Sequence, residues 1–387
     1  MKHRLNVALF AFCRLIIFTP MRMIYPFLPA LARGLKVNLE TISLAVSASI
    51  ITSAIAPFLA PVAERRGRKV GMLLGLVLFI LGVLALAAWP TVWAFFLSLF
   101  LVNLGDNVFT PAAQAYLGDR IPYDQRGRVL AVLEVGWSLS FILCVPLAGL
   151  LIERYGWQSP FVALTAAGVL ITLLVIGWVP RDIRPPVEQR HLLFDFKKVM
   201  TYPPALAGLL MGVGILTGNQ VVGLAFGAWM EDSFGLQVAA LGLASALIGF
   251  SELGGEGLAA LVADRLGKKR AVTIGLALNI LAGGGLRLLP HTLWGALAWL
   301  VVFFLSFEFA VVCSLPLMNE VLPEQRATTM AAYLAAGSIG IGLGAWLAPF
   351  FYHWGMWANG LACVVFDLGA LLALSRVRIG ENSAFQA

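Results

Sequence analysis

Charged side chains interrupt several long apolar segments of this sequence, and their types and spacing are the first guide to its chemistry. A charge in the middle of a lipid bilayer costs at least about 2.5 kcal/mol unless it faces a partner or water. Such residues therefore mark paths for ions, protons or polar ligands. Each half of the chain holds one set: Arg14, Arg22, Asp106 and Glu134, then Glu252, Glu256, Glu308 and Asp367.

The charges of the first set sum to zero, so its members can neutralise one another. Arg14 and Asp106 lie at similar depths when residues are counted from the ends of their apolar segments, which allows them to pair. Glu134 is the other possible partner of Arg14. Arg22 lies deeper in its segment, nearer the side of the membrane opposite the amino terminus. There it would bind either an anionic group of a substrate or a structural partner.

The second set contains carboxyl groups and no base at comparable depth. Carboxylates without a counter-ion cannot all be charged in a low-dielectric bundle, so some should hold a proton near neutral pH. That property suits a proton carrier, with carboxyls that stay protonated for structural reasons as the alternative. Glu308 and Glu252, at nearly equal depths, are the favoured proton sites. The further candidates for proton coupling are Glu256, Asp367, Asp106 and Glu134.

Neutral polar side chains add hydrogen-bonding capacity to the same segments. With Arg14, Arg22 and Asp106, the candidates for substrate binding are Asn103, Asn107, Asn219 and Gln220. The four cysteines lie apart in apolar segments, the histidines form no ligand cluster, and no phosphate-binding glycine loop is present. The sequence therefore predicts neither a metal site nor a cofactor.

The composition places these residues in a membrane protein. Of the 387 residues, 60% are hydrophobic and only 12% are charged, and the mean hydropathy is +0.88. These values lie far from those of soluble domains. The net charge of +7 then indicates membrane topology rather than a surface for nucleic acid.

Apolar segments of roughly 20 residues or more predict twelve transmembrane helices. The turns between them are short, so neighbouring helices run antiparallel, and helices satisfy the backbone of such segments in lipid. The expected spans are residues 5–32, 39–62, 70–89, 92–117, 128–153, 157–179, 204–231, 237–263, 271–289, 292–320, 327–353 and 355–376.

The basic residues predict the orientation of these helices. Most of the 27 Lys and Arg residues fall in segments on the same side as the amino terminus, whereas the opposite side holds Arg33, Lys36, Arg154 and Arg287. By the positive-inside rule, both termini are cytoplasmic. The expected location is a bacterial inner membrane, which the chain crosses many times.

The chain is predicted to be a duplication. The segment Glu64-Arg65-Arg66-Gly67-Arg68-Lys69 recurs as Asp264-Arg265-Leu266-Gly267-Lys268-Lys269, 200 positions later, with glycine for each chain reversal. A second pair of turns, residues 121–126 and 322–326, repeats at nearly the same offset. The expected domains are residues 1–179, a cytoplasmic linker at 180–203, and residues 204–387. Within the linker, residues 191–200 form either a short amphipathic helix on the membrane surface or an ordinary tether.

The two basic turns resemble the loop signature of the major facilitator superfamily, in which an acid, an arginine, a glycine and two bases join the second and third helices of each half. The resemblance implies two pseudo-symmetric six-helix bundles that rock about a central site, with the first, fourth, seventh and tenth helices lining a cavity. It also implies that the turns latch the cytoplasmic side in the outward-facing state. The latch residues would be Glu64, Arg65, Gly67, Arg68, Asp264, Arg265 and Gly267.

The sequence therefore predicts an all-α integral membrane transporter and not an enzyme, since spacing places no nucleophile beside a base. The expected function is proton-coupled export, by antiport, of an amphipathic small organic molecule through alternating access. The alternatives are proton-coupled uptake of a small anionic metabolite through Arg14 and Arg22, and a lipid- or ligand-binding protein that does not transport. Expected partners are the substrate, protons and membrane lipids, and the protein is expected to be a monomer that binds no nucleic acid.

Overall fold

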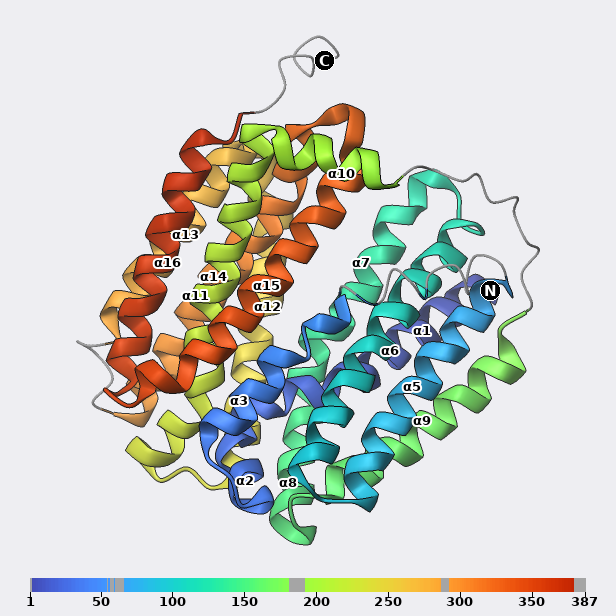
Figure 1. Ribbon diagram of the computed structural model, residues 1–387, viewed down its shortest axis with the longest axis vertical. Helices are drawn as coiled ribbons and strands as arrows, with labels where there is room; N and C mark the ends of the chain where they lie inside the picture. The colour runs from blue at the N-terminus through green and yellow to red at the C-terminus, as the bar shows by residue number, and fades with distance from the viewer. Residues whose placement is uncertain are drawn as a thin grey trace. The chain divides into compact units, whose positions relative to one another are not determined.

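Helices are the only regular structure in the residues that the computed structural model describes, which are 2–53, 55, 59, 66–180, 192–286 and 292–378 (Figure 1). This confirms the expected all-α class. Contacts between residues divide the chain into two compact units. The first unit comprises Met1–Glu188 with Gly235–Gly249, and the second comprises Gln189–Phe234 with Phe250–Ala387. The expected domain boundaries at 179 and 204 stay a prediction.

In the first unit, α5 packs against α6 and α9, and α1 packs against α7. The close approach of α5 and α6 depends on two glycines, since a Cβ atom at either Gly75 or Gly105 would lie 2.6 Å from the carbonyl oxygen of the other. The helices are α1 (Lys2–Arg22), α2 (Ile24–Leu35), α3 (Leu39–Ala48), α5 (Arg68–Ala88), α6 (Val92–Gly118), α7 (Tyr123–Leu139), the π-helical turn η1 (Ser140–Cys144), α8 (Val145–Tyr155) and α9 (Ser159–Trp178).

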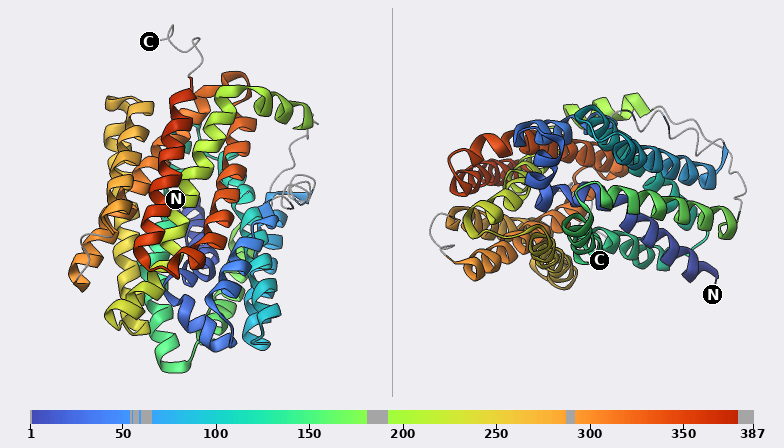
Figure 2. Two further views of the ribbon diagram at one scale, coloured as in Figure 1. Left: turned by 60° about the vertical axis from the view of Figure 1, so that its left-hand side comes forward. Right: turned by 90° about the horizontal axis from the view of Figure 1, so that it is seen from below.

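In the second unit, α11 packs against α14, α15 and α16, and α13 packs against α14 and α16 (Figures 1 and 2). Small residues again bring helices together, because a Cβ atom at Gly340 of α15 would lie 2.6 Å from the carbonyl oxygen of Val213. The helices are α10 (Leu192–Thr201), α11 (Pro203–Phe234), α12 (Val238–Leu266), α13 (Lys268–Gly285), α14 (Leu293–Val321), the 3₁₀ turn η2 (Pro323–Gln325), α15 (Arg326–Tyr352) and α16 (Met356–Arg376). The first part of α12, up to Gly249, belongs to the first unit.

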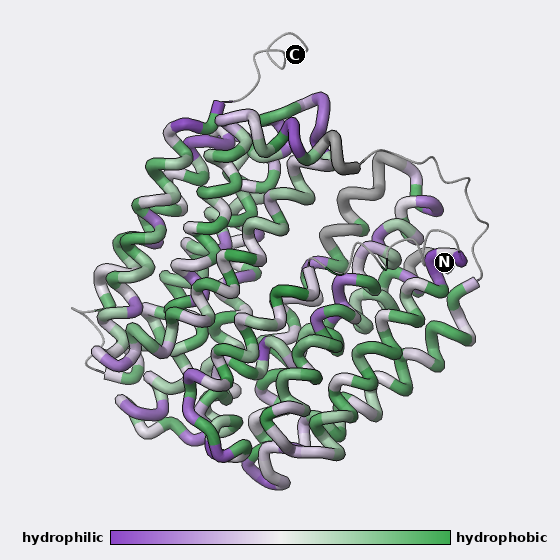
Figure 3. Tube along the Cα trace, viewed as in Figure 1, coloured by the Kyte–Doolittle hydropathy of each residue, from purple (hydrophilic) through white to green (hydrophobic). Residues whose placement is uncertain are grey.

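Among the described residues, 10 helices are long and apolar enough to cross a membrane. The number rises to 11 if Ile24–Leu35 and Leu39–Ser53, which are bent by 116° relative to each other, form one span. Helix α13 is not among these candidate spans, because its first turn holds the three bases Lys268, Lys269 and Arg270. Seven residues of the expected span at 39–62, all after residue 53, lie outside the described residues, so the number twelve stays a prediction. Apolar residues dominate the lengths of the helices, as Figure 3 shows.

Prolines interrupt two of the expected spans. Helix α1 ends at Arg22, because Pro26 has no N–H group to donate to the carbonyl of Arg22. The next segment follows after one residue, with the N–H of Met23 bonded to the carbonyl oxygen of Thr19 at 2.9 Å. In the expected span 128–153, the π-helical turn η1 comes just before Pro146, and the extra residue in this turn absorbs the break.

The linker contains a helix, α10, which confirms the helical alternative for residues 192–201. Val199 is fully buried in the core of the second unit, and Lys198 bonds Glu324 of η2 at 2.7 Å. Phe196, Lys197 and Met200 are exposed on the other side of α10. The position of α10 on a membrane surface stays a prediction.

Candidate functional site

Arg14 and Glu134 form the central ion pair of the first unit. The Nη1 and Nη2 atoms of Arg14 donate to the two carboxylate oxygens of Glu134 at 2.7 and 3.1 Å, which is a bidentate arrangement. Gln114 of α6 donates to the same carboxylate at 3.2 Å. The Arg14 side chain is 5% exposed and that of Glu134 is 51% exposed, so the pair joins a buried base to an accessible acid.

Asp106 is not the hydrogen-bonded partner of Arg14, which decides between the two partners that the sequence left open. Its carboxylate instead accepts a bond from the hydroxyl of Thr110, four residues along α6, at 2.8 Å. Arg14 still acts on Asp106 electrostatically. Depth gave an ambiguous answer because Asp106 and Glu134 lie on different helices, and the rotation of each helix about its axis decides which acid faces Arg14.

Arg22 is held by aromatic rings. Its guanidinium lies 4.0 Å from the centre of the Trp137 ring and 3.8 Å from that of Phe141, within the range of cation–π interaction. The residue is only 3% exposed. Phe18 completes the row, because it lies 4.8 Å from the Arg14 guanidinium and meets Trp137 edge-on at 5.0 Å. Both bases of the first set are therefore engaged by neighbours in the first unit.

The spacing of this row explains how the sequence builds it. Residues 14, 18 and 22 repeat every four positions along α1, and residues 134, 137 and 141 repeat every three or four along α7 and η1. Residues at these spacings share one helix face. Sequence reasoning missed Trp137 and Phe141, although their spacing from Glu134 was the available signal.

The two asparagines of α6 bond to side chains near the end of α3. Asn103 donates to the hydroxyl of Ser49 at 2.8 Å, and Asn107 lies 3.4 Å from the hydroxyl of Thr52. Both asparagines are half-buried. Asp106 and Gln114 are further polar residues of α6. A substrate could bind the two asparagines only by replacing their bonds to Ser49 and Thr52.

Three acids of the second set lie near the place where α12 and α14 pack against each other. A Cβ atom at Gly255 would lie 2.8 Å from the Cβ of Glu308 and 2.7 Å from the carbonyl oxygen of Leu305, so the two helices nearly touch there. Glu252 and Glu256 flank Gly255 within one helical turn. Glu252 and Glu308 are buried, and Glu256 is half-buried. Their role in proton coupling stays a prediction at this point.

Asp367 lies in a separate polar cluster in the middle of α16. The thiol of Cys363 is 3.5 Å from the Asp367 carboxylate and 3.5 Å from the amide oxygen of Asn279, on α13. Asn279 in turn donates to Ser306 of α14 at 3.1 Å. Asp367 is 1% exposed, so this chain of polar groups crosses the interior of the second unit. Sequence reasoning singled out Asp367 but assigned no role to Asn279 or Cys363.

The polar pair of α11 is divided between two environments. Asn219 is half-buried, whereas Gln220 is fully buried and lies against α15. A Cβ atom at Gly344 would meet the Cβ of Gln220 at 2.6 Å, which shows how closely the two helices pack at this residue. A substrate can therefore reach Asn219 more readily than Gln220.

The glycines of the two basic turns have similar backbone conformations. Gly67 has a φ of 106° and Gly267 a φ of 81°, values that L-amino acids with side chains rarely adopt, which explains the glycines. Glu64 and Arg65 lie outside the described residues, and Asp264 and Arg265 are exposed.

Bases after each glycine bind the end of the fourth helix of their own half. The Nε of Arg68 lies 3.7 Å from Asp119, which follows α6, and Lys268 bonds Glu320 near the end of α14. These contacts lie within one unit each. The latch role of the turns stays a prediction.

The last base of each turn binds the end of the sixth helix of its half, a feature not expected from the sequence. Lys69 donates to the carbonyl oxygens of Ile176 and Val179 at 2.8 and 2.6 Å. Lys269 donates to those of Ser375 and Val377 at 3.2 and 2.8 Å. A cation at a helix carboxyl terminus satisfies carbonyls that have no partner within the helix and interacts favourably with the helix dipole.

Replacing either lysine by methionine should destabilise the protein by about 1–2 kcal/mol, because each substitution removes charged hydrogen bonds to two carbonyl oxygens. Lys69→Met and Lys269→Met should lower the thermal unfolding midpoint of the purified protein by similar amounts. Arg270→Met is the matched control, since Arg270 is an exposed base next to Lys269. Equal effects of Lys269→Met and Arg270→Met would show that these lysines do not cap the helices.

Comparison with known proteins decides the family. The family model for the Major Facilitator Superfamily matches residues 10–318 and 208–385. The chain belongs to this superfamily. The uncharacterized MFS-type transporter YwfA of Bacillus subtilis is 27% identical over 361 residues, which cover 91% of this chain and 87% of that protein. The multi-drug resistance efflux pump PmrA homolog of Lactococcus lactis is 27% identical over 329 residues, covering 80% and 79% of the two chains.

A solved structure supports the same fold. A bacterial homolog of the human lysosomal transporter Spinster aligns with a TM-score of 0.78 over 97% of this chain and 95% of that chain, at 14% sequence identity. The protein is thus a multi-pass membrane transporter of the major facilitator superfamily, a family of transporters rather than enzymes.

Proposed function

We propose that this major facilitator superfamily transporter exports an amphipathic organic molecule from the cytoplasm in exchange for protons, by alternating access in a bacterial inner membrane. The observation that carries the proposal is the crossing of α12 and α14, which gathers Glu252, Glu256 and Glu308 within the second unit. Buried carboxyl groups at one level of a membrane bundle favour the uptake and release of protons.

The sequence around this crossing strengthens the case for protons. Residues 204–263, 292–320 and 355–375 contain no Lys or Arg. Burial in a membrane bundle disfavours the charged form of a carboxyl group, and protonation lowers that cost. Asp367 on α16 is a further proton site by the same reasoning.

The first unit favours a substrate that is neutral or positively charged over an anion. Arg14 and Arg22 are buried and engaged by Glu134 and by aromatic rings. The acids of this unit are more exposed than the arginines: Glu134 is half exposed, although Arg14 and Gln114 bind it, and Asp106 is half-buried. Accessible acids attract a cation, and the nearby aromatic rings suit an apolar body. This arrangement disfavours uptake of an anionic metabolite through the two arginines.

The direction of transport is proposed from a relative. The Lactococcus lactis protein that aligns with 80% of this chain is called a multi-drug resistance efflux pump homolog. Export of a cation in exchange for protons would use the inward proton gradient. In this proposal, both termini and the basic turns face the cytoplasm, where the turns at 64–69 and 264–269 latch the outward-facing state.

The proposal is tested in everted inner-membrane vesicles that contain the protein. Ethidium, a fluorescent organic cation, should accumulate when respiration acidifies the lumen, and accumulation should stop when a protonophore collapses the gradient. Vesicles with an empty vector provide the baseline, and fluorescein provides an anion of similar size. Accumulation of fluorescein but not of organic cations would overturn the assignment of substrate charge. Accumulation unaffected by the protonophore would overturn proton coupling.

A further inference from the structure

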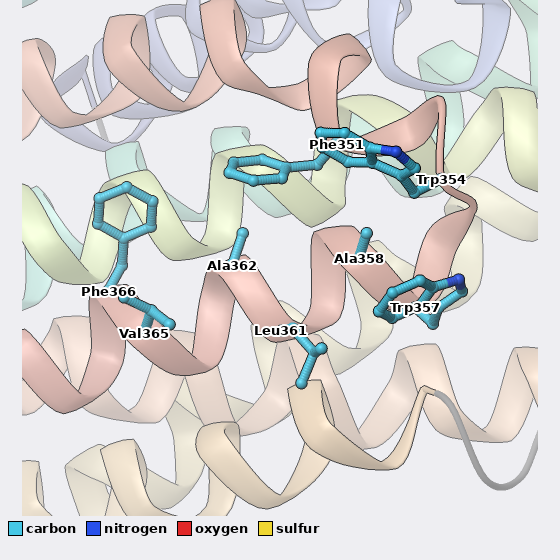
Figure 4. A pocket seen from close by; sticks show the side chains of 8 residues that line it. All are labelled: Phe351, Trp354, Trp357, Ala358, Leu361, Ala362, Val365 and Phe366. Carbon is cyan, nitrogen blue, oxygen red and sulfur yellow. The ribbon is translucent and has the colours of Figure 1, made fainter.

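The geometry points to a binding groove for one acyl chain of a membrane phospholipid on the outer surface of the second unit, between the end of α15 and the first half of α16. The groove has a volume of about 350 Å³ and is lined by side chains of which none is charged (Figure 4). They are Phe351, Trp354, Trp357, Ala358, Leu361, Ala362, Val365 and Phe366. This site is separate from the charged residues discussed above and does not depend on the proposed function.

Two alanines make the floor of the groove. Ala358 and Ala362 are four residues apart and therefore lie on one face of α16. Phe351 of α15 and Trp354, two residues beyond its end, stand beside this face, as Figure 4 shows. Trp354 and Val365 are 56% and 66% exposed, so the groove opens on the surface of the unit rather than into its core. Both helices are apolar enough to span a membrane, so a surface of this kind faces lipid.

The length of the groove matches one leaflet. From Trp357 to Phe366 the helix rises about 14 Å at 1.5 Å per residue. Half of the hydrocarbon core of a bilayer is about 15 Å thick. The tryptophans lie beside the turn between α15 and α16, where interfacial residues belong, and Phe366 lies near the middle of α16. An acyl chain lying in the groove would therefore place its headgroup near the turn at His353.

Hydrogen bonds hold α15 and α16, the two helices beside the groove, in place without a ligand. The amide of Asn359 donates to the carbonyl oxygens of Val221 and Ala348, at 2.9 and 2.8 Å, and so joins α16 to α11 and α15. The hydroxyl of Tyr352 donates to Asp232 at 2.7 Å, which fixes the end of α15 to the end of α11. A groove between fixed helices loses little entropy on binding, which favours a retained lipid over a passing one.

The leaflet follows from the position of the turn. Lys269 binds the carbonyl of Val377, just beyond the end of α16, so the basic turn lies at that end of the helix. The groove lies at the opposite end, beside Met356, where α16 begins. The lipid therefore belongs to the leaflet opposite the basic turns.

The test uses the full-length protein in vesicles of phosphatidylethanolamine and phosphatidylglycerol, with a small fraction of phosphatidylglycerol that carries a diazirine midway along one acyl chain. After irradiation, mass spectrometry of peptides maps the adducts. Peptides that cover residues 351–366 should carry several-fold more adducts than peptides of α9, whose Val162 and Leu173 are also exposed. Adducts spread in proportion to exposure would overturn the proposal.

Two variants make the test specific. Ala358→Leu with Ala362→Leu fills the floor and should reduce labelling to the level of α9. Trp354→Ala opens one wall and should also reduce it, which keeps the test valid if the filled variant unfolds. The matched control is Gly369→Leu, because a side chain at Gly369 of α16 would meet nothing within 4 Å. Unchanged labelling in the filled variant would show that no lipid is retained in this groove.

Discussion

Glu308→Gln should reduce the substrate gradient that a pH difference sustains by about ten-fold per pH unit, because each pH unit across the membrane supplies about 1.4 kcal/mol per proton exchanged. Glutamine keeps the size and hydrogen-bonding capacity of the side chain but cannot exchange a proton. Glu308 is buried beside α12, so this change removes the proposed proton site without exposing new surface. The measurement is ethidium accumulation in everted vesicles at several imposed pH differences.

Matched variants separate coupling from folding. Glu308→Asp keeps a carboxyl group and should retain a dependence on the pH difference. Glu40→Gln changes an acid in the first turn of α3 and should behave as the parent protein does. If accumulation responds equally to pH in the parent, in Glu308→Gln and in a variant that neutralises Glu252, Glu308 and Asp367 together, the carboxyl groups do not couple transport to protons.

Removing Glu134 should destabilise the first unit far more than removing Arg14. In Glu134→Met the guanidinium of Arg14 stays buried without its bidentate partner, and leaving one charge of a buried pair unpaired costs about 3 kcal/mol or more. In Arg14→Met the remaining carboxylate is half exposed, so water and Gln114 can solvate it, and the cost should be about 1 kcal/mol. Thermal unfolding of the purified variants measures both.

The double variant Arg14→Met with Glu134→Met completes the cycle. It should be more stable than Glu134→Met alone, because the stranded charge is gone. Adding Asp106→Asn to Glu134→Met should lower the stability further, since Asp106 is the other acid that acts on Arg14. Equal costs for the two single variants would contradict the asymmetry that the exposures of the two side chains predict.

Hydropathy predicted the helices because each span must bury its own backbone, a requirement local to the segment. The positive φ angles at Gly67 and Gly267 were predictable for the same reason, since a tight reversal needs glycine. The pairing of Arg14 was not, because depth constrains the position along the helix axis but not the rotation of each helix about that axis. The break at Met23 was also missed, although Pro20 and Pro26 mark it in the sequence.

Contacts made through the backbone were hidden from sequence reasoning altogether. The carbonyl oxygens that Lys69 and Lys269 bind have no residue-type signature, so nothing in residues 176–179 or 375–377 marked them as partners. The arrangement of the acids on α12 and α14 was predictable in part. Residue counting placed Glu252 and Glu308 at one level, but only the glycine at 255 shows how closely their helices approach.

The two capping lysines also fix where the chain leaves each bundle. Lys69 binds the carbonyl of Val179 just before the linker begins, and Lys269 binds that of Val377 just before the carboxyl-terminal tail. A pulling force on the linker or on the carboxyl-terminal tail would therefore act on an anchored helix terminus and would not unwind the helix turn by turn. Lengthening the linker with a flexible insert at residues 185–188 should leave the thermal stability of the protein unchanged while Lys69 is present, and should lower it below that of Lys69→Met alone when the two changes are combined.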